Sequence, residues 1–108
     1  MSQRYDHFVT KVLTTLIEGR GELSSETRRA IVNRETKGIP PALLPYVLKV
    51  ALHAYKVEDD DITGLQRDGL SEDQIFEATV SAALGAALLR LDRGMAALRG
   101  NTADGDRR

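Results

Sequence analysis

The chain has 108 residues, a formal charge of −1 and no cysteine. This length suits one domain with a single hydrophobic core, and the lack of cysteine excludes disulfides, thiol nucleophiles and thiolate metal sites. Aliphatic residues and alanine dominate the apolar 42% of the chain, whereas aromatic residues make up only 5%, a balance that favours packed helices over packed sheets. We therefore expect a single all-α domain of about five helices over residues 1–100, followed by a flexible tail at 101–108.

Charge and hydropathy exclude several classes of partner. A net charge near zero gives no field that would attract nucleic acid or an anionic membrane surface. The longest uncharged run, 78–89, has 12 residues, whereas a helix that spans a bilayer needs about 20. The first residues are polar rather than a basic region followed by an apolar one, so no signal peptide is visible. We expect a cytoplasmic protein with no nucleic-acid or membrane partner.

The first two predicted helices differ in how much apolar surface they carry. The first covers about 6–18, with an apolar stripe at spacings of three and four. That stripe consists of Phe8, Val9, Val12, Leu13, Leu16 and Ile17. The second begins with Ser24 or Ser25 as its N-cap and ends before Gly38. Its apolar residues, 30–32, stand among basic side chains, so we expect this helix to lie on the surface.

The third predicted helix follows the extended connection Ile39-Pro40-Pro41 and runs to about Lys56. Pro45, in its early part, can break off a short leading turn. Its expected apolar face contains Leu44, Val47, Leu48, Ala51 and Tyr55. Beside that face, a polar stripe at steps of three and four contains Tyr46, Lys49, His53 and Lys56. The stripe is either a solvated helix face or the wall of a pocket, and the sequence leaves both readings open.

As the wall of a pocket, the polar stripe would have a definite chemistry. Imidazole exchanges protons near neutral pH, so His53 is the candidate catalytic acid or base. Tyr46, Lys49 and Lys56 are the candidate ligand-binding residues, because the two cations suit a small anionic ligand. No metal or cofactor is expected, since His7 and His53 are the only histidines and neither has a partner at metal-ligand spacing.

The fourth predicted helix, from about Asp60 to Arg67, begins with acids and ends before Gly69, its C′ residue. Consecutive acids at 58–61 are typical of caps and dipole partners, and the alternating ligands of an EF-hand are not present. The helix after Gly69 opens with the acids Glu72 and Asp73. These acids would repel phosphates, which argues against a helix-turn-helix that binds DNA.

The fifth predicted helix, Glu72 to Arg99, is the longest. Ser71 is its N-cap, and Gln74 completes a capping box. At about 1.5 Å per residue it would be about 42 Å long, whereas a compact chain of this size has a radius of gyration of about 13 Å. Either the helix bends near Gly85 or another subunit shares its apolar surface. Ala78, Ala82 and Ala86 form a small-residue row that another helix can approach closely, within the chain or from a partner. We expect a homo-oligomer through the helix 72–99.

The phrase Gly69-Leu70-Ser71-Glu72-Asp73-Gln74-Ile75-Phe76-Glu77, running into the apolar stretch 78–89, resembles the core of the alkylhydroperoxidase-like, carboxymuconolactone decarboxylase-like helical family. The resemblance covers about 42–98 and implies the family's helical fold. It also implies a Cys-x-x-Cys-x-x-x-His redox site, whose cysteines would fall at Ala54 and Val57 and whose histidine would fall at Asp61. The family's relay glutamate would fall near Ala42. Because a thiolate is the required nucleophile, this chain is not expected to be a thiol peroxidase.

Two functions are consistent with these residues. The first is a member of this family without redox activity, acting as an oligomeric binding or assembly protein. The alternative is a cysteine-independent enzyme that acts on a small carboxylate or lactone, with His53 as acid or base. The decarboxylase branch of the family works without cysteine on carboxylated lactones, so a cationic stripe is compatible with that alternative.

Overall fold

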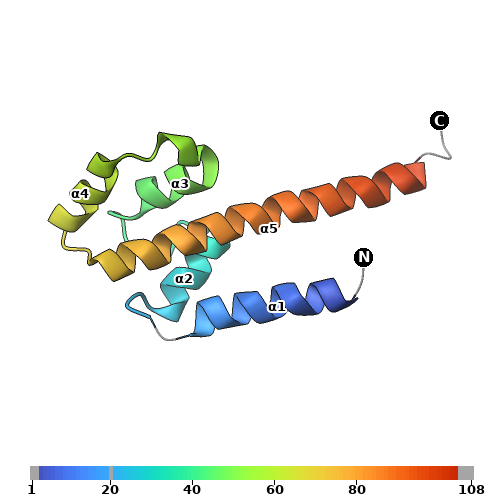
Figure 1. Cartoon of the computed structure of the whole chain (residues 1–108), viewed down its shortest axis with the longest axis horizontal. Helices are drawn as coiled ribbons and strands as arrows, with labels where there is room; N and C mark the ends of the chain where they lie inside the picture. Colours follow the sequence, from blue (N-terminus) through green and yellow to red (C-terminus); the bar gives the residue numbers. More distant parts are fainter. Residues whose placement is uncertain (1–2, 20, 105–108) are drawn as a thin grey trace.

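A computed structural model of the chain describes residues 3–19 and 21–104. These residues form five α-helices and one short 3-10 helix, and they contain no strand (Figure 1). The elements are α1 (Gln3–Glu18), α2 (Ser25–Val32), α3 (Leu44–His53), the 3-10 helix η1 (Ala54–Lys56), α4 (Asp59–Arg67) and α5 (Glu72–Asp104). The predicted all-α class, with a long C-terminal helix, is confirmed. Residues 101–104, predicted as tail, form the last turn of α5, and 105–108 lie outside the described residues.

Local capping interactions explain where α4 and α5 begin and where α4 ends. Ser71 accepts a hydrogen bond from the Gln74 amide at 3.1 Å, and the Ser71 amide donates to Gln74 Oε1 at 2.8 Å. This is the predicted capping box of α5. At the start of α4, the Glu58 amide donates to Asp61 Oδ2 at 2.8 Å, so the acidic run caps this helix as predicted. Gly69 has a φ of 94°, the left-handed conformation expected of a C′ glycine.

Helix α2 differs from its prediction in both length and position. It ends at Val32, because Arg34 turns to a positive φ of 57° and the chain then passes through turns as far as Gly38. The prediction that α2 lies on the surface is wrong. Ala30, Ile31 and Val32 are buried against the rest of the chain. Although α2 has only eight residues, it lies between α1 and α5, so its few apolar side chains are enough to fill the space there.

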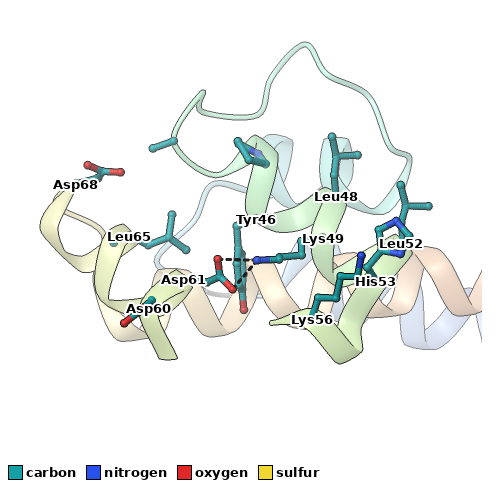
Figure 2. A pocket seen from close by; sticks show the side chains of 13 residues that line it. Tyr46, Leu48, Lys49, Leu52, His53, Lys56, Asp60, Asp61, Leu65 and Asp68 are labelled. Carbon is teal, nitrogen blue, oxygen red and sulfur yellow. Dashed lines mark hydrogen bonds and ion pairs between the residues drawn. The ribbon is translucent and has the colours of Figure 1, made fainter. Parts of the chain in front are cut away.

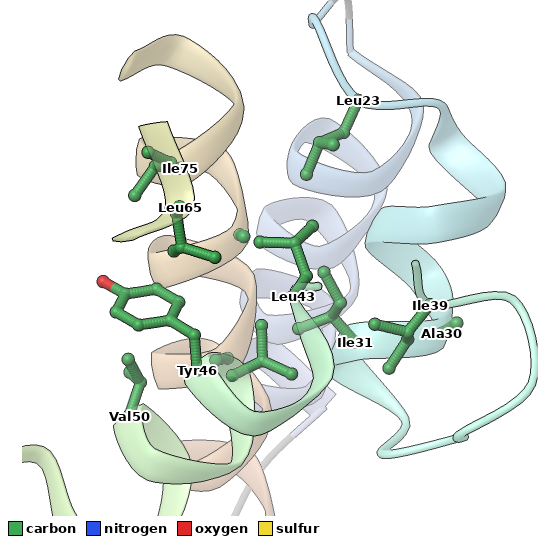
Figure 3. Packing of buried hydrophobic residues seen from close by; sticks show 12 residues of the cluster. Leu23, Ala30, Ile31, Ile39, Leu43, Tyr46, Val50, Leu65 and Ile75 are labelled. Atoms are coloured by element: carbon green, nitrogen blue, oxygen red, sulfur yellow. The ribbon is translucent and has the colours of Figure 1, made fainter. Parts of the chain in front are cut away.

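The core lies where α2 and α3 meet the first half of α5 (Figure 3). Leu43, just before α3, is fully buried at its centre. The buried residues around it come from α2, α3, α4, α5 and the segments that precede α2 and α3. They include Leu23, Ile31, Ile39, Tyr46, Val47, Val50, Leu65 and Ile75. Burying aliphatic side chains of this kind stabilises a fold by about 1.5–3 kcal/mol each. The core therefore fixes α3 relative to α5 and, through Leu65, α4 relative to both.

The small-residue row of α5 is used within the chain. Ala78, Ala82 and Ala86 are buried, on the side of α5 that faces α2 and α3. At Gly85 the approach is closest, since a Cβ atom there would lie 3.1 Å from both the Cα and the carbonyl carbon of Val32. Helix α5 continues through Gly85 as one helix (Figure 1). The row therefore packs α5 on α2 and α3, and the predicted subunit contact needs a different face of α5.

The molecule is elongated, with extents of 57 × 28 × 22 Å and a radius of gyration of 16.5 Å, above the about 13 Å of a compact chain. Helix α1 packs on α2 and runs beside α5 in the opposite direction, and both helices project beyond α2–α4 (Figure 1). An open groove of about 380 Å³ separates them, with Leu13 and Ile17 on one side and Leu88 and Leu89 on the other. The second half of α5 therefore lies outside the core.

One described segment, Glu72–Gly100, is long and apolar enough to cross a membrane by length and composition. Its mean hydropathy reaches 1.2 over the best window, and a third of that window is buried in the fold. Helices that form the core of a helical protein pass the same test, and the first half of α5 carries the core alanines.

Candidate functional site

A groove of about 540 Å³ lies between α3 and α4 and is open to solvent (Figure 2). All four residues of the predicted polar stripe border it, together with Ala42, Pro45, Leu48, Leu52, Asp60, Asp61, Gly64, Leu65 and Asp68. Its volume lies within the range of about 300–1,000 Å³ that is typical of small-molecule sites. Because α3 and α4 are both fixed by the core, the backbone on either side of the groove is held in place.

Tyr46 is the most buried member of the stripe, with 6% of its surface exposed. Its hydroxyl lies 2.6 Å from Thr79 Oγ1 on α5. Thr79 Oγ1 donates its own hydrogen to the Ile75 carbonyl at 2.7 Å, so Tyr46 is the donor in the bond to Thr79. Tyr46 therefore belongs to the floor of the groove and ties α3 to α5, and its hydrogen is already engaged.

Lys49 is paired within the chain. Its Nζ lies 2.9 Å and 3.0 Å from the two carboxylate oxygens of Asp61, across the groove from α3 to α4. Asp61 stands where the family resemblance places a histidine. The hydrogen bond from the Glu58 amide, followed by that from Lys49, lowers the pKa of Asp61 below its ordinary value of 3.8. The carboxylate therefore stays ionised at neutral pH, and Lys49 has a counter-charge before any ligand arrives.

His53 and Lys56 are exposed on the α3 side of the groove, at the end of α3 and in η1. The ring of Tyr55, which is 81% exposed, lies edge-on to the His53 ring with centroids 6.1 Å apart. The same ring has Lys56 Nζ at 5.8 Å from its centroid. These contacts hold the two side chains near each other, and contacts of this kind at exposed sites are weak, about 0.5–1 kcal/mol.

The predicted apolar face of the third helix is divided in the structure. Val47 and Ala51 are buried, whereas Leu48 is 40% exposed and Tyr55 is almost fully exposed. Tyr55 is exposed because α3 ends at His53 and the chain continues as a 3-10 helix, which rotates the following side chains away from the α-helical stripe. Leu48 and Leu52 instead form an apolar part of the groove wall.

Sequence reasoning missed the α4 side of the groove. Asp60, Asp61 and Asp68 line it, although the acids at 58–61 were predicted only as caps. A lysine and an aspartate twelve residues apart carry no pairing signal in the sequence, so only the packing of α4 beside α3 brings Lys49 and Asp61 together. Within 3–19 and 21–104, no group of three or more His, Asp or Glu side chains is placed to hold a metal ion.

Comparison with protein-family models, with curated proteins and with solved structures found no match to this chain. The chemistry of the groove therefore rests on its own residues. It presents one exposed imidazole and one exposed ammonium beside apolar side chains, and an imidazole N–H and an ammonium can each donate a hydrogen bond to a carboxylate ligand.

Proposed function

We propose that this chain is a binding protein without thiol redox activity, of the alkylhydroperoxidase-like helical type, that assembles into a homo-oligomer in the cytoplasm. Its ligand would be a small carboxylate held in the groove between α3 and α4. The observation that carries this proposal is that His53 and Lys56 both border the groove, whereas Lys49 is already neutralised by Asp61. Lys56 supplies the charge, His53 can donate a hydrogen bond, and Leu48 and Leu52 supply apolar contact.

This arrangement supports weak and reversible binding. An ion pair at an exposed site contributes about 0.2–1 kcal/mol, so Lys56 alone cannot hold a ligand tightly. The apolar wall adds about 25 cal/mol for each Å² of apolar surface that it covers. A carboxylate with a short hydrocarbon chain uses both contributions, so we expect dissociation constants in the millimolar range for simple monocarboxylates.

Titration of the isotope-labelled chain with hexanoate, followed by amide NMR shifts, tests the proposal. Amides of 42–68 should shift in a saturable way, and the Lys56→Gln variant should bind about two- to five-fold more weakly, the factor that corresponds to one exposed ion pair. Lys37→Gln removes a similar exposed charge that does not border the groove, and it should leave the affinity unchanged. Shifts that spread evenly over the chain would contradict a site in this groove.

The alternative function is a cysteine-independent enzyme in which His53 transfers a proton on a small carboxylate or lactone. It is favoured by the exposure of His53 on the same groove as Lys56, since a general acid or base must reach its substrate. A panel of lactones tests it, because His53→Gln should abolish any hydrolysis while hexanoate binding persists. Turnover that survives this substitution would exclude His53 as the acid or base.

The lack of thiol redox activity has its own test. The chain has no cysteine, so it has no thiolate to attack a hydroperoxide. Hydroperoxide consumption with a dithiol reductant should equal that of buffer alone. Turnover by metal-free, homogeneous protein would contradict this part of the proposal.

Assembly is supported by the apolar surface that α1 and α5 leave open. Leu84, Leu88, Leu91 and Met95 of α5 follow steps of four, three and four, the spacing of a helix-pairing seam, and each is only half-buried. A partner copy could place its own α5 along this seam. This seam lies on another side of α5 from the buried alanine row.

A further inference from the structure

We propose that the groove between α3 and α4 selects a zwitterionic ligand, one that carries an ammonium group as well as a carboxylate. This inference rests on the proposed binding function and names its ligand class. It follows from the charged groups that line the groove and that are not part of the Lys49–Asp61 ion pair.

The two sides of the groove carry opposite charges. On the α3 side, His53 and Lys56 are exposed, and on the α4 side, Asp60 and Asp68 are exposed. Figure 2 shows the two sets well apart, with the Lys49–Asp61 pair between them. Because that pair is internally neutral, it adds little net charge to either side. A ligand in the groove therefore meets the Lys56 ammonium on one side and carboxylates on the other.

Asp68 is the more informative of the two acids. Asp60 lies in the first turn of α4, where a carboxylate is favoured by the helix dipole and needs no other explanation. Asp68 is the C-cap residue of the same helix, where the dipole favours a cation and disfavours a carboxylate. The helix dipole therefore does not explain an aspartate at position 68. Because Asp68 lines the groove, a role in binding a positively charged group does explain it.

The same acids disfavour a second carboxylate. A dicarboxylate that placed one carboxylate on Lys56 would bring its other carboxylate towards Asp60 or Asp68. The like charges of these carboxylates would repel each other and weaken binding. An ω-amino carboxylate of equal length would instead place an ammonium group there. The apolar side chains that line the groove, Leu48 of α3 and Leu65 of α4 among them, suit a hydrocarbon spacer.

Three six-carbon acids that differ only at the far end provide the test: hexanoate, aminohexanoate with its terminal amine, and adipate. At neutral pH and low salt, amide NMR titration of the full chain should give affinities in the order aminohexanoate, hexanoate, adipate. The amine should improve the affinity about two- to five-fold, as one exposed ion pair would. The comparison is repeated with four- and eight-carbon sets, because the spacer must match the width of the groove.

Substitutions assign the effect to the α4 side. The double variant Asp60→Asn with Asp68→Asn should lose the preference for the amino acid and keep hexanoate binding. Asp59→Asn removes an exposed acid of the same run that does not line the groove, and it should keep the preference. If hexanoate binds but the amine gives no gain at any length, or adipate binds best, the zwitterion proposal is overturned and the carboxylate site stands. If no acid binds, both proposals fail.

Discussion

Gly85 lies where α2 crosses α5 with the least space between them. A methyl group at this position would press on the backbone of Val32, and backbone cannot move aside as a flexible side chain would. Most single contacts in this small core involve side chains that can repack, but this one joins two helix backbones. The crossing of α2 over α5 therefore depends on one missing Cβ atom.

Gly85→Ala should destabilise the fold by about 1–3 kcal/mol, because α2 must shift away from α5. The matched control is Gly94→Ala, since Gly94 is in the same helix and nothing lies within 4 Å of its would-be Cβ. That variant should stabilise the chain by up to about 1 kcal/mol through helix propensity. Urea unfolding midpoints measure both changes. Equal shifts of the same sign in the two variants would contradict the close crossing.

Asp61 connects stability to pH. Its pKa in the folded chain lies below the ordinary 3.8 because of the Glu58 amide and then Lys49, so its contribution to stability is complete above about pH 4. As the pH falls below that value, the contribution is lost through the lowered folded pKa. In Asp61→Asn, the free energy of unfolding should therefore decrease less steeply as the pH falls than it does in the natural chain, and equal slopes in the two proteins would contradict this role of Asp61.

The same variant tests the groove. Without the carboxylate, Lys49 Nζ loses the partner that lies at 2.9 Å and becomes available to a ligand anion. Asp61→Asn should thus bind hexanoate more tightly in the NMR titration, although α4 loses part of its cap. Weaker binding would mean that the ion pair shapes the groove rather than competing with the ligand for Lys49.

A buried arginine of α2 binds the end of helix α1. Arg28 of α2 is buried, and its guanidinium donates to the carbonyls of Leu16 at 2.6 Å and Gly19 at 2.5 Å. These carbonyls lie at the end of α1, which has a partial negative charge that favours a cation. The segment between α1 and α2 is bound to α5 as well, since the Glu77 carboxylate accepts hydrogen bonds from the amides of Glu22 and Leu23 at 2.8 and 2.9 Å.

Arg28→Ala should release α1 while α3 and α5 stay packed. It leaves two partly buried carbonyls without their charged donor, which costs about 2–3 kcal/mol. Hydrogen exchange should accelerate in α1 and remain slow around Ala82. Arg67→Ala, which removes an exposed arginine of α4, serves as the control and should leave α1 protected. Uniform acceleration along the chain would show that α1 unfolds only with the whole domain.

Helix boundaries and caps could be predicted from the sequence because they depend on residues three or four apart. The capping box at Ser71, the glycine at Gly69 and the acidic cap of α4 are of this kind. The burial of α2 could not be predicted, since its three apolar residues become core only when α5 offers Gly85 beside them. The groove has the same origin, because three of its four predicted residues are on α3 but the counter-charge of Lys49 comes from Asp61 of α4.

At the scale of the whole molecule, α1 and the second half of α5 form an arm with apolar residues along an open groove. We expect sedimentation equilibrium at micromolar concentration to give a multiple of the chain's 11.9 kDa. Met95→Glu, within the α5 seam, should return the mass to that of one chain without unfolding it. Ala97→Glu adds the same charge on the opposite side of the helix and should stay associated. A single-chain mass for the natural protein would refute the assembly.

The outline of 57 × 28 × 22 Å also determines how the molecule tumbles. A rod-like body rotates quickly about its long axis and slowly about the other two. Amide N–H bonds in an α-helix point along the helix axis, so those of α5, which lies along the length of the molecule (Figure 1), report only the slow rotation. In a single chain, ¹⁵N relaxation should therefore give α5 longer apparent correlation times than elements set across it. Side-by-side pairing along α5 would thicken the body and reduce that difference.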